Sequence, residues 1–72
     1  ILYIEGLKEY VKIYTVNGKT IVTKTQLSHL ENELGKNGFI RIHRSFIVPK
    51  NKIDAYSAAD VEIMGRNIPI GR

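Results

Sequence analysis

The sequence predicts a mostly-β domain with one short helix, and three observations lead to this fold class. Short apolar runs rich in β-branched and aromatic residues recur along the 72 residues, separated by turn residues such as Gly, Asn and Pro. The dipeptide Asn17-Gly18 stands between two of these runs, which is the strongest short-range signal for a β-hairpin. Only residues 25–35 place their apolar side chains at helical spacing. A chain of this length forms one domain, with about six to eight short strands.

The Asn-Gly hairpin is predicted to join Tyr10–Val16 to Lys19–Lys24. Both central residues of a type I′ turn need positive φ, which Asn and Gly tolerate best. A two-residue turn of this type sets Ile13 opposite Val22 and Tyr14 opposite Ile21. Both faces of the hairpin are then partly apolar, so we expect it to pack between layers.

The other strands are predicted from shorter apolar runs. Ile1–Ile4 is wholly apolar and is expected to be a buried strand, and Ile53–Tyr56 is a further short strand. Val61–Met64 is expected to pair with Asn67–Ile70 across a Gly-Arg turn. Pro69 has no backbone N–H to donate, so this last strand is predicted at a sheet edge.

The one predicted helix lies in the segment TQLSHLENELG. Leu27, Leu30 and Leu34 form one apolar stripe at spacings of three and four residues. Thr25 is the expected N-cap and Gly35 the expected C-terminal stop. The polar residues on the outer faces are His29, Glu31, Asn32 and Glu33.

The segment FIRIHRSFIVPKNKI, residues 39–53, carries charges within an apolar run. Strict alternation puts Arg41 and His43 on one face and the intervening isoleucines on the other. If the strand simply continued, Arg44 would fall in an apolar row, where an unpaired charge is costly. We therefore predict a bulge or tight turn at His43–Ser45, which aims Arg44 outward before the strand resumes at Phe46.

Composition limits the classes of function. Eleven Lys and Arg against seven Asp and Glu give a net charge of +4, which points weakly to a polyanionic partner. The absence of cysteine excludes a disulfide framework and suits a cytoplasmic location. No apolar run approaches the roughly 18–20 residues that would cross a bilayer, so no membrane association is expected.

Catalytic and cofactor chemistry find no support in the sequence. The histidines are His29 and His43, and without cysteine or a paired acidic cluster they lack the partners of a zinc site. Ser28 and His29 are neighbours on the predicted helix and point apart, unlike a nucleophile and its base. Phosphate-binding glycine motifs are missing, as are the two or three helices of a helix-turn-helix. We expect no enzyme, no cofactor and no metal, and nucleic acid could be bound only by strands and loops.

Several segments in order resemble a known family. EGLKEYVKI after an apolar strand, then FIRIHRSFIV, a Lys-Ile pair ending at residue 53 and the terminal IPIGR together resemble the LytTR DNA-binding domain. This is the output domain of LytR/AlgR-type bacterial response regulators, and the similarity runs over nearly the whole chain. The resemblance implies an elongated, all-β arrangement of small antiparallel sheets with one short helix. It also implies loops that enter successive major grooves of double-stranded DNA, with two copies on a direct-repeat promoter site.

The resemblance also implies roles for individual residues. Arg44 and Arg72 match base-contacting positions, and Lys8 is the expected contact in the loop Gly6–Tyr10. The implied phosphate contacts are His43, Ser45 and Lys12. The planar guanidinium of Arg44 suits guanine O6 and N7, the commonest specific contact in the major groove.

Alternative interpretations stand beside these roles. Alternation alone explains Arg41 as a solvated strand-face residue. His43 either touches phosphate or forms a hydrogen bond that holds the bulge. At the level of the domain, the alternative is a small SH3-like β module that binds a protein or RNA segment. Such a groove would need an exposed aromatic cluster with acidic neighbours, whereas the tyrosines here lie within apolar strands and the cations at turns.

The wider context of the domain is also an expectation. The chain lacks an initiator Met and stops abruptly at IPIGR, so residues 1–72 are expected to be one LytTR-like domain of a longer protein. An N-terminal receiver domain, phosphorylated on aspartate, is the implied partner within that protein. The domain alone is expected to be monomeric, because it offers no long apolar helix face and direct-repeat sites need no two-fold interface.

Overall fold

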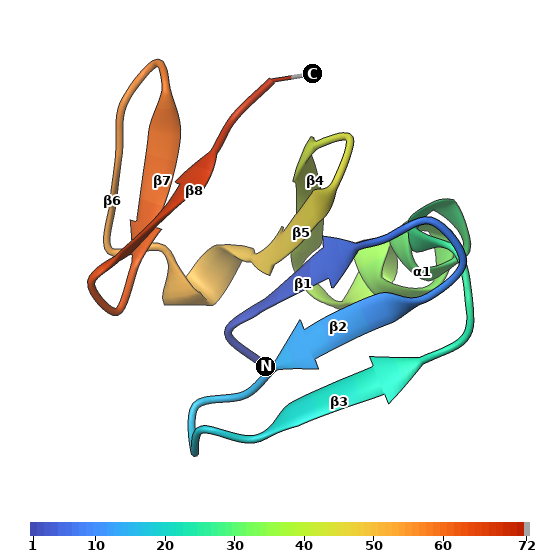
Figure 1. Cartoon of the computed structure of the whole chain (residues 1–72). Helices are drawn as coiled ribbons and strands as arrows, with labels where there is room; N and C mark the ends of the chain where they lie inside the picture. Colours follow the sequence, from blue (N-terminus) through green and yellow to red (C-terminus); the bar gives the residue numbers. More distant parts are fainter. Residues whose placement is uncertain (72) are drawn as a thin grey trace.

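The computed structural model describes residues 1–71 and contains two antiparallel sheets and one α-helix (Figure 1). The mostly-β fold class with one short helix is therefore confirmed. The strands are β1 (Tyr3–Gly6), β2 (Val11–Tyr14), β3 (Thr20–Thr23), β4 (Phe39–His43), β5 (Phe46–Pro49), β6 (Ala55–Tyr56), β7 (Asp60–Ile63) and β8 (Arg66–Pro69). The helix α1 spans Leu27–Leu34, and two short 3-10 helices, η1 (Gly35–Asn37) and η2 (Lys50–Lys52), join neighbouring elements.

The larger sheet has the strand order β3-β2-β1-β5-β4, and the smaller one has the order β6-β7-β8. Strand β1 lies at the centre of the larger sheet, and its Ile4 is fully buried, as the apolar start of the chain predicts. The strand itself begins two residues later than expected, at Tyr3. Pro69 lies in β8, an edge strand of the smaller sheet, as its missing N–H predicts.

The core consists of two apolar clusters on opposite faces of the larger sheet. Side chains alternate between faces along a strand, so β1 contributes Tyr3 to one cluster and Ile4 to the other. The first cluster fills the space between the two sheets, where Tyr3 stacks on Tyr14 with ring centroids 4.5 Å apart. The second lies under α1, which contributes Leu27.

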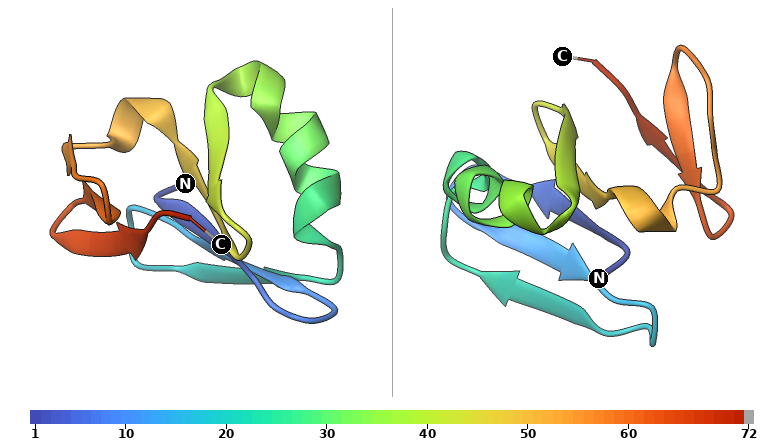
Figure 2. Two further views of the ribbon diagram at one scale, coloured as in Figure 1. Left: turned by 90° about the horizontal axis from the view of Figure 1, so that it is seen from above. Right: turned by 180° about the vertical axis from the view of Figure 1, so that it is seen from behind.

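These two clusters place α1 and the smaller sheet on opposite faces of the larger sheet, an arrangement visible in Figure 2. The molecule measures 30 × 27 × 22 Å along its principal axes, so it is only modestly elongated. Helix α1 has eight residues, and no helix within residues 1–71 is long and apolar enough to cross a membrane.

The register of the β2–β3 hairpin differs from the prediction by one residue. Ile13 lies opposite Ile21, and Tyr14 lies opposite Thr20. The loop is longer than a type I′ turn: the Thr15 N–H donates to the Lys19 carbonyl at 3.1 Å, and only Gly18 has positive φ. One extra loop residue shifts every cross-strand pair, because turn length sets the register of a hairpin.

Three other local predictions differ in detail from the structure. The N-cap of α1 is Gln26 rather than Thr25, and its side chain makes no capping hydrogen bond. Gly35 does end the α-helix, but with φ −58° it continues into η1, and Gly38 supplies the left-handed residue. The β7–β8 turn lies one residue earlier than expected, with positive φ at Met64 and at the glycine that follows it.

Candidate nucleic-acid interface

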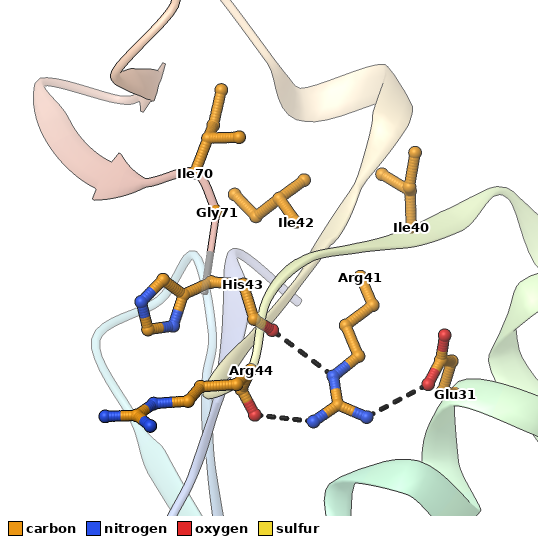
Figure 3. A pocket seen from close by; sticks show the side chains of 8 residues that line it. All are labelled: Glu31, Ile40, Arg41, Ile42, His43, Arg44, Ile70 and Gly71. Carbon is orange, nitrogen blue, oxygen red and sulfur yellow. Dashed lines mark hydrogen bonds and ion pairs between the residues drawn. The ribbon is translucent and has the colours of Figure 1, made fainter.

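The β4–β5 turn places Arg44 at an exposed tip. Strand β4 ends at His43 and β5 begins at Phe46, and the pairing shifts register between Arg41 and His43. The predicted tight turn at His43–Ser45 is therefore confirmed, while the register shift itself lies just before it, between Arg41 and His43. Arg44 is exposed, and its side chain extends away from that of Arg41 (Figure 3).

His43 braces this turn from within. The Ser45 backbone N–H donates to His43 Nδ1 at 3.0 Å, and the imidazole centroid lies 5.4 Å from the ring of Phe46. The geometry therefore supports the interpretation in which His43 holds the turn. Because Nδ1 accepts this hydrogen bond, the neutral ring carries its proton on Nε2, where it remains a donor for a ligand. The bulge also overturns strict alternation, since His43 packs on Phe46 while Arg41 points toward α1.

Arg41 is not a solvated strand-face residue, and that interpretation was wrong. Its Nε donates to the His43 carbonyl at 3.2 Å, Nη2 donates to the Arg44 carbonyl at 2.6 Å, and Nη1 lies 3.0 Å from Glu31 Oε1 (Figure 3). The side chain of Arg41 is only 26% exposed to solvent. One guanidinium thus links the turn to α1.

The β1–β2 loop lies beside the same turn. The Gly6 N–H donates to the Ser45 carbonyl at 2.7 Å, and the loop closes through a 2.9 Å hydrogen bond from the Leu7 N–H to the Tyr10 carbonyl. An open groove of about 680 Å³ between loop and turn is lined in part by Lys8, Arg44 and Ser45. Three residues predicted from two separate segments therefore share one surface.

Lys12 lies outside this groove, in a row of side chains that begins at His43. His43 lies opposite Phe46, Phe46 opposite Glu5, and Glu5 opposite Lys12, so four neighbouring strands contribute one row. Paired residues of an antiparallel sheet project to the same face. Three strand spacings of about 4.8 Å separate Lys12 from His43 by about 14 Å. Lys12 is thus on the same face as His43 but does not line the groove that holds Lys8 and Arg44.

Glu5 lies in this row, between Phe46 and Lys12, and forms a hydrogen bond with a tyrosine. The Tyr14 hydroxyl donates to Glu5 Oε1 at 3.0 Å. Burial, together with this hydrogen bond to the carboxylate, raises the pKa of Tyr14. One of the two carboxylate oxygens of Glu5 is therefore engaged by Tyr14.

The C-terminal segment runs to the same turn. The Gly71 N–H donates to the Ile42 carbonyl at 2.7 Å, and Gly71 forms a parallel bridge with His43. In the left view of Figure 2 the β1–β2 loop, the β4–β5 turn and the segment that follows β8 lie along the same side of the molecule. Arg72, a predicted base contact, lies outside the described residues.

Arg41 and Glu31 are the site residues that sequence reasoning missed. The signal for Glu31 was its position four residues after Leu27, since this spacing returns a helix to nearly the same face. Leu27 is 7% exposed and packs on the sheet, so Glu31 lies at the flank of the buried stripe rather than on the outer face. Nothing in the spacing of Arg41 predicts that its side chain donates to the carbonyls two and three residues further on, those of His43 and Arg44.

The surface offers cations and hydrogen-bond donors rather than catalytic groups. Within residues 1–71, no three His, Asp or Glu side chains come together as a possible metal site. Exposed Lys and Arg side chains with backbone and imidazole donors bind phosphates and base edges. Tyr3, Tyr14 and Phe46 of the larger sheet pack on one another between the sheets instead of forming an exposed peptide-binding cluster.

Comparison with known proteins decides between these classes of partner. A family model for the LytTr DNA-binding domain matches residues 1–72, the whole chain. The chain belongs to the LytTR DNA-binding domain family. Searches of curated proteins and of solved structures returned no significant match. The LytTR domain binds DNA, which favours this hypothesis over the SH3-like module, and the family is one of DNA-binding domains rather than enzymes.

Proposed function

We propose that this LytTR domain recognises a specific sequence of double-stranded DNA by placing the β4–β5 turn and the β1–β2 loop in the major groove. The observation that carries the proposal is the 2.7 Å hydrogen bond between Gly6 and Ser45, which joins the two segments. It brings Lys8 and Arg44, predicted contacts 36 positions apart in the sequence, to the lining of one groove.

Arg44 and Lys8 are the proposed base contacts. Arg44 is exposed at the tip of a braced turn, and its planar fork matches O6 and N7 of guanine. Lys8 lines the same groove and is proposed to contact a neighbouring base as a single cation. Arg72 is proposed as a third base contact from the family resemblance alone.

His43, Ser45 and Lys12 are the proposed phosphate contacts. His43 offers its Nε2 proton, because Nδ1 is occupied by the Ser45 N–H. The major groove of B-DNA is about 12 Å wide. The separation of about 14 Å between His43 and Lys12 along the sheet suits phosphates on the two sides of that groove.

The biological setting follows from the same resemblance. We propose that the domain is the output part of a bacterial two-component regulator, with a receiver domain on its N-terminal side. In this setting it acts in the cytoplasm, and two copies bind a direct-repeat promoter site. A direct repeat orients both copies the same way, so each can use the same loop and turn without a two-fold interface.

Salt dependence tests the electrostatic part of the proposal. If four to six phosphates are contacted, log affinity falls against log salt with a slope of about −4 to −5. The measurement is a fluorescence-anisotropy titration of the domain with a labelled duplex, selected by the domain from a randomised pool, at several salt concentrations. A slope near zero would contradict phosphate binding by this surface.

A further inference from the structure

We infer that Glu31, an acidic residue on α1, sets the sequence discrimination of the domain by holding Arg41 against the β4–β5 turn. Glu31 and Arg41 are positioning residues in this inference, and Arg44 makes the contact with DNA. The inference rests on the proposal that Arg44 reads a base. It assigns a role in specificity to an acidic side chain, the residue type that phosphates repel.

The contacts of Arg41 fix the backbone on both sides of Arg44. Its Nε binds the carbonyl of His43, and its Nη2 binds the carbonyl of Arg44 itself, at 3.2 and 2.6 Å. Each carbonyl direction sets the plane of one peptide. The two peptides that flank the Arg44 Cα are therefore both held, and with them the direction in which the Arg44 side chain leaves the chain.

Glu31 holds Arg41 in that position. Glu31 Oε1 lies 3.0 Å from Nη1, on the opposite side of the guanidinium from the two carbonyls (Figure 3). Helix α1 provides a fixed support, because Leu27 is buried against the larger sheet and Leu30 packs on the same cluster. Glu31 is the only residue of α1 that forms a hydrogen bond with Arg41 within the described residues, so without the carboxylate the guanidinium is free to turn toward solvent.

The turn needs such support because loop tips are mobile by default. Base reading by arginine depends on a bidentate geometry that tolerates little displacement. The Arg41–Glu31 pair is partly exposed, with side-chain exposures of 26% and 47%, so it adds little net stability. We therefore expect its loss to change discrimination between DNA sequences much more than folding.

The sign of the effect separates this inference from simple electrostatics. Glu31→Ala raises the net charge by one, which by charge alone strengthens binding to every duplex. We expect instead that the ratio of affinities for the selected and a scrambled duplex falls by about 3- to 10-fold, a part of the discrimination that one bidentate arginine provides. The salt slope should stay unchanged, since no phosphate contact is removed.

Glu33→Ala is the matched control. Glu33 lies on the same helix and carries the same charge, but its Oε1 lies 3.7 Å from Nε2 of His29 rather than beside Arg41. The affinity ratio of this variant should equal that of the wild type. Both variants place alanine, a strong helix former, at partly exposed helical positions, so both should fold, as circular dichroism and thermal melting will check.

Three further variants complete the test. Arg41→Ala should lower the ratio as much as Glu31→Ala or more, and the double variant should lower it no further than Arg41→Ala. Arg41→Lys keeps the charge but lacks the fork that contacts two carbonyls and a carboxylate, so it should not restore the ratio. If it does, the role of Arg41 is its charge, and the inference is wrong.

Arg44→Ala distinguishes failure of this inference from failure of the proposed function. If Arg44→Ala discriminates like the wild type, Arg44 does not read a base and the proposed function fails. If Arg44→Ala loses discrimination while Glu31→Ala behaves like Glu33→Ala, the proposed function stands and the positioning role of Glu31 is overturned.

Discussion

Arg44 and Lys12 carry the same charge in very different settings. Arg44 is at the tip of a turn whose carbonyl and N–H groups are held by Arg41 and His43. Lys12 lies within β2, opposite Glu5. A braced tip suits the reading of a base, whereas a lysine on a strand face suits contact with a phosphate.

We therefore expect Arg44→Ala and Lys12→Ala to impair DNA binding in different ways. Arg44→Ala should weaken binding to the selected duplex by about 1–3 kcal/mol and leave binding to a scrambled duplex nearly unchanged. Lys12→Ala should weaken both alike and reduce the salt slope by about one. Paired anisotropy titrations of each purified variant make the comparison. Equal losses on both duplexes for Arg44→Ala would mean that Arg44 contacts the backbone only.

Tyr14 links stability to pH through its hydroxyl. Burial and the hydrogen bond to Glu5 raise the pKa of Tyr14, so the folded state favours the protonated phenol. This contribution is present below pH 10.0, the ordinary value of the pKa, and is lost as pH rises through the folded pKa. Tyr14→Phe should cost about 0.5–1.5 kcal/mol near neutral pH and remove this part of the alkaline decline. Urea unfolding at neutral and alkaline pH measures both; identical pH dependence in the two proteins would contradict the linkage.

At the residue scale, sequence reasoning predicted exposure better than contacts. The high cost of burying Arg44 was enough to predict the turn and the outward direction of its side chain. The same alternation argument failed for Arg41, because a long side chain on the predicted outer face can bend back to carbonyls two and three residues away. Such contacts depend on the shape of the turn, which spacing does not encode.

Gly6 is the position at which β1, α1 and the β4–β5 turn meet. A Cβ built there would lie 3.0 Å from Leu27 Cδ2 and 3.1 Å from Leu27 Cβ. The Gly6 N–H also makes the hydrogen bond to Ser45 that joins loop and turn. The absence of a side chain thus lets the end of β1 approach the helix and the turn together.

Gly6→Ala should therefore cost about 1–3 kcal/mol of stability, because the extra methyl overpacks the contact with Leu27. Gly35→Ala is the control: Gly35 has φ −58° and nothing within 4 Å of an added Cβ, so this change should be neutral or stabilising by up to about 1 kcal/mol. Thermal melting of both variants gives the comparison. A Gly6→Ala protein as stable as the wild type would show that α1 shifts freely.

At the element scale, the existence of most elements could be predicted, but their registers could not. The Asn-Gly signal correctly located the β2–β3 hairpin, yet the loop contains one more residue than a type I′ turn and moves Ile13 to face Ile21. Because both faces of this hairpin carry apolar residues, the pattern of apolar and polar residues does not distinguish one register from the other. The β7–β8 turn shows the same limit, since Met64 adopts a positive φ that its residue type does not suggest.

The whole molecule should be a monomer in the absence of DNA. Its most exposed apolar strand is β3 at the edge of the larger sheet, where Ile21 is 50% and Val22 58% exposed. Lys19 and Lys24 flank this strand, and edge charges discourage pairing between sheets. Sedimentation velocity at micromolar concentration should give a single species near 8.2 kDa. A tight dimer would instead point to pairing through β3.

The relative placement of loop, turn and chain end was beyond the reach of sequence reasoning alone. The hydrogen bonds from Gly6 to Ser45 and from Gly71 to Ile42 create one surface from three distant segments. These are contacts between backbone groups, which every residue type carries, so the pattern of side chains does not predict them. Only the family resemblance linked the segments in advance, and it did so by position rather than by physical argument.

The central claim is that the β4–β5 turn and the β1–β2 loop form the DNA-reading surface. Amide chemical shifts of the ¹⁵N-labelled domain, followed while the selected duplex is added, test it most directly. We expect the largest changes at residues 6–10, at 43–45 and at Gly71. Changes concentrated instead on Lys36, Lys50 and Lys52, the basic residues at the opposite end of the β4–β5 hairpin, would contradict the claim.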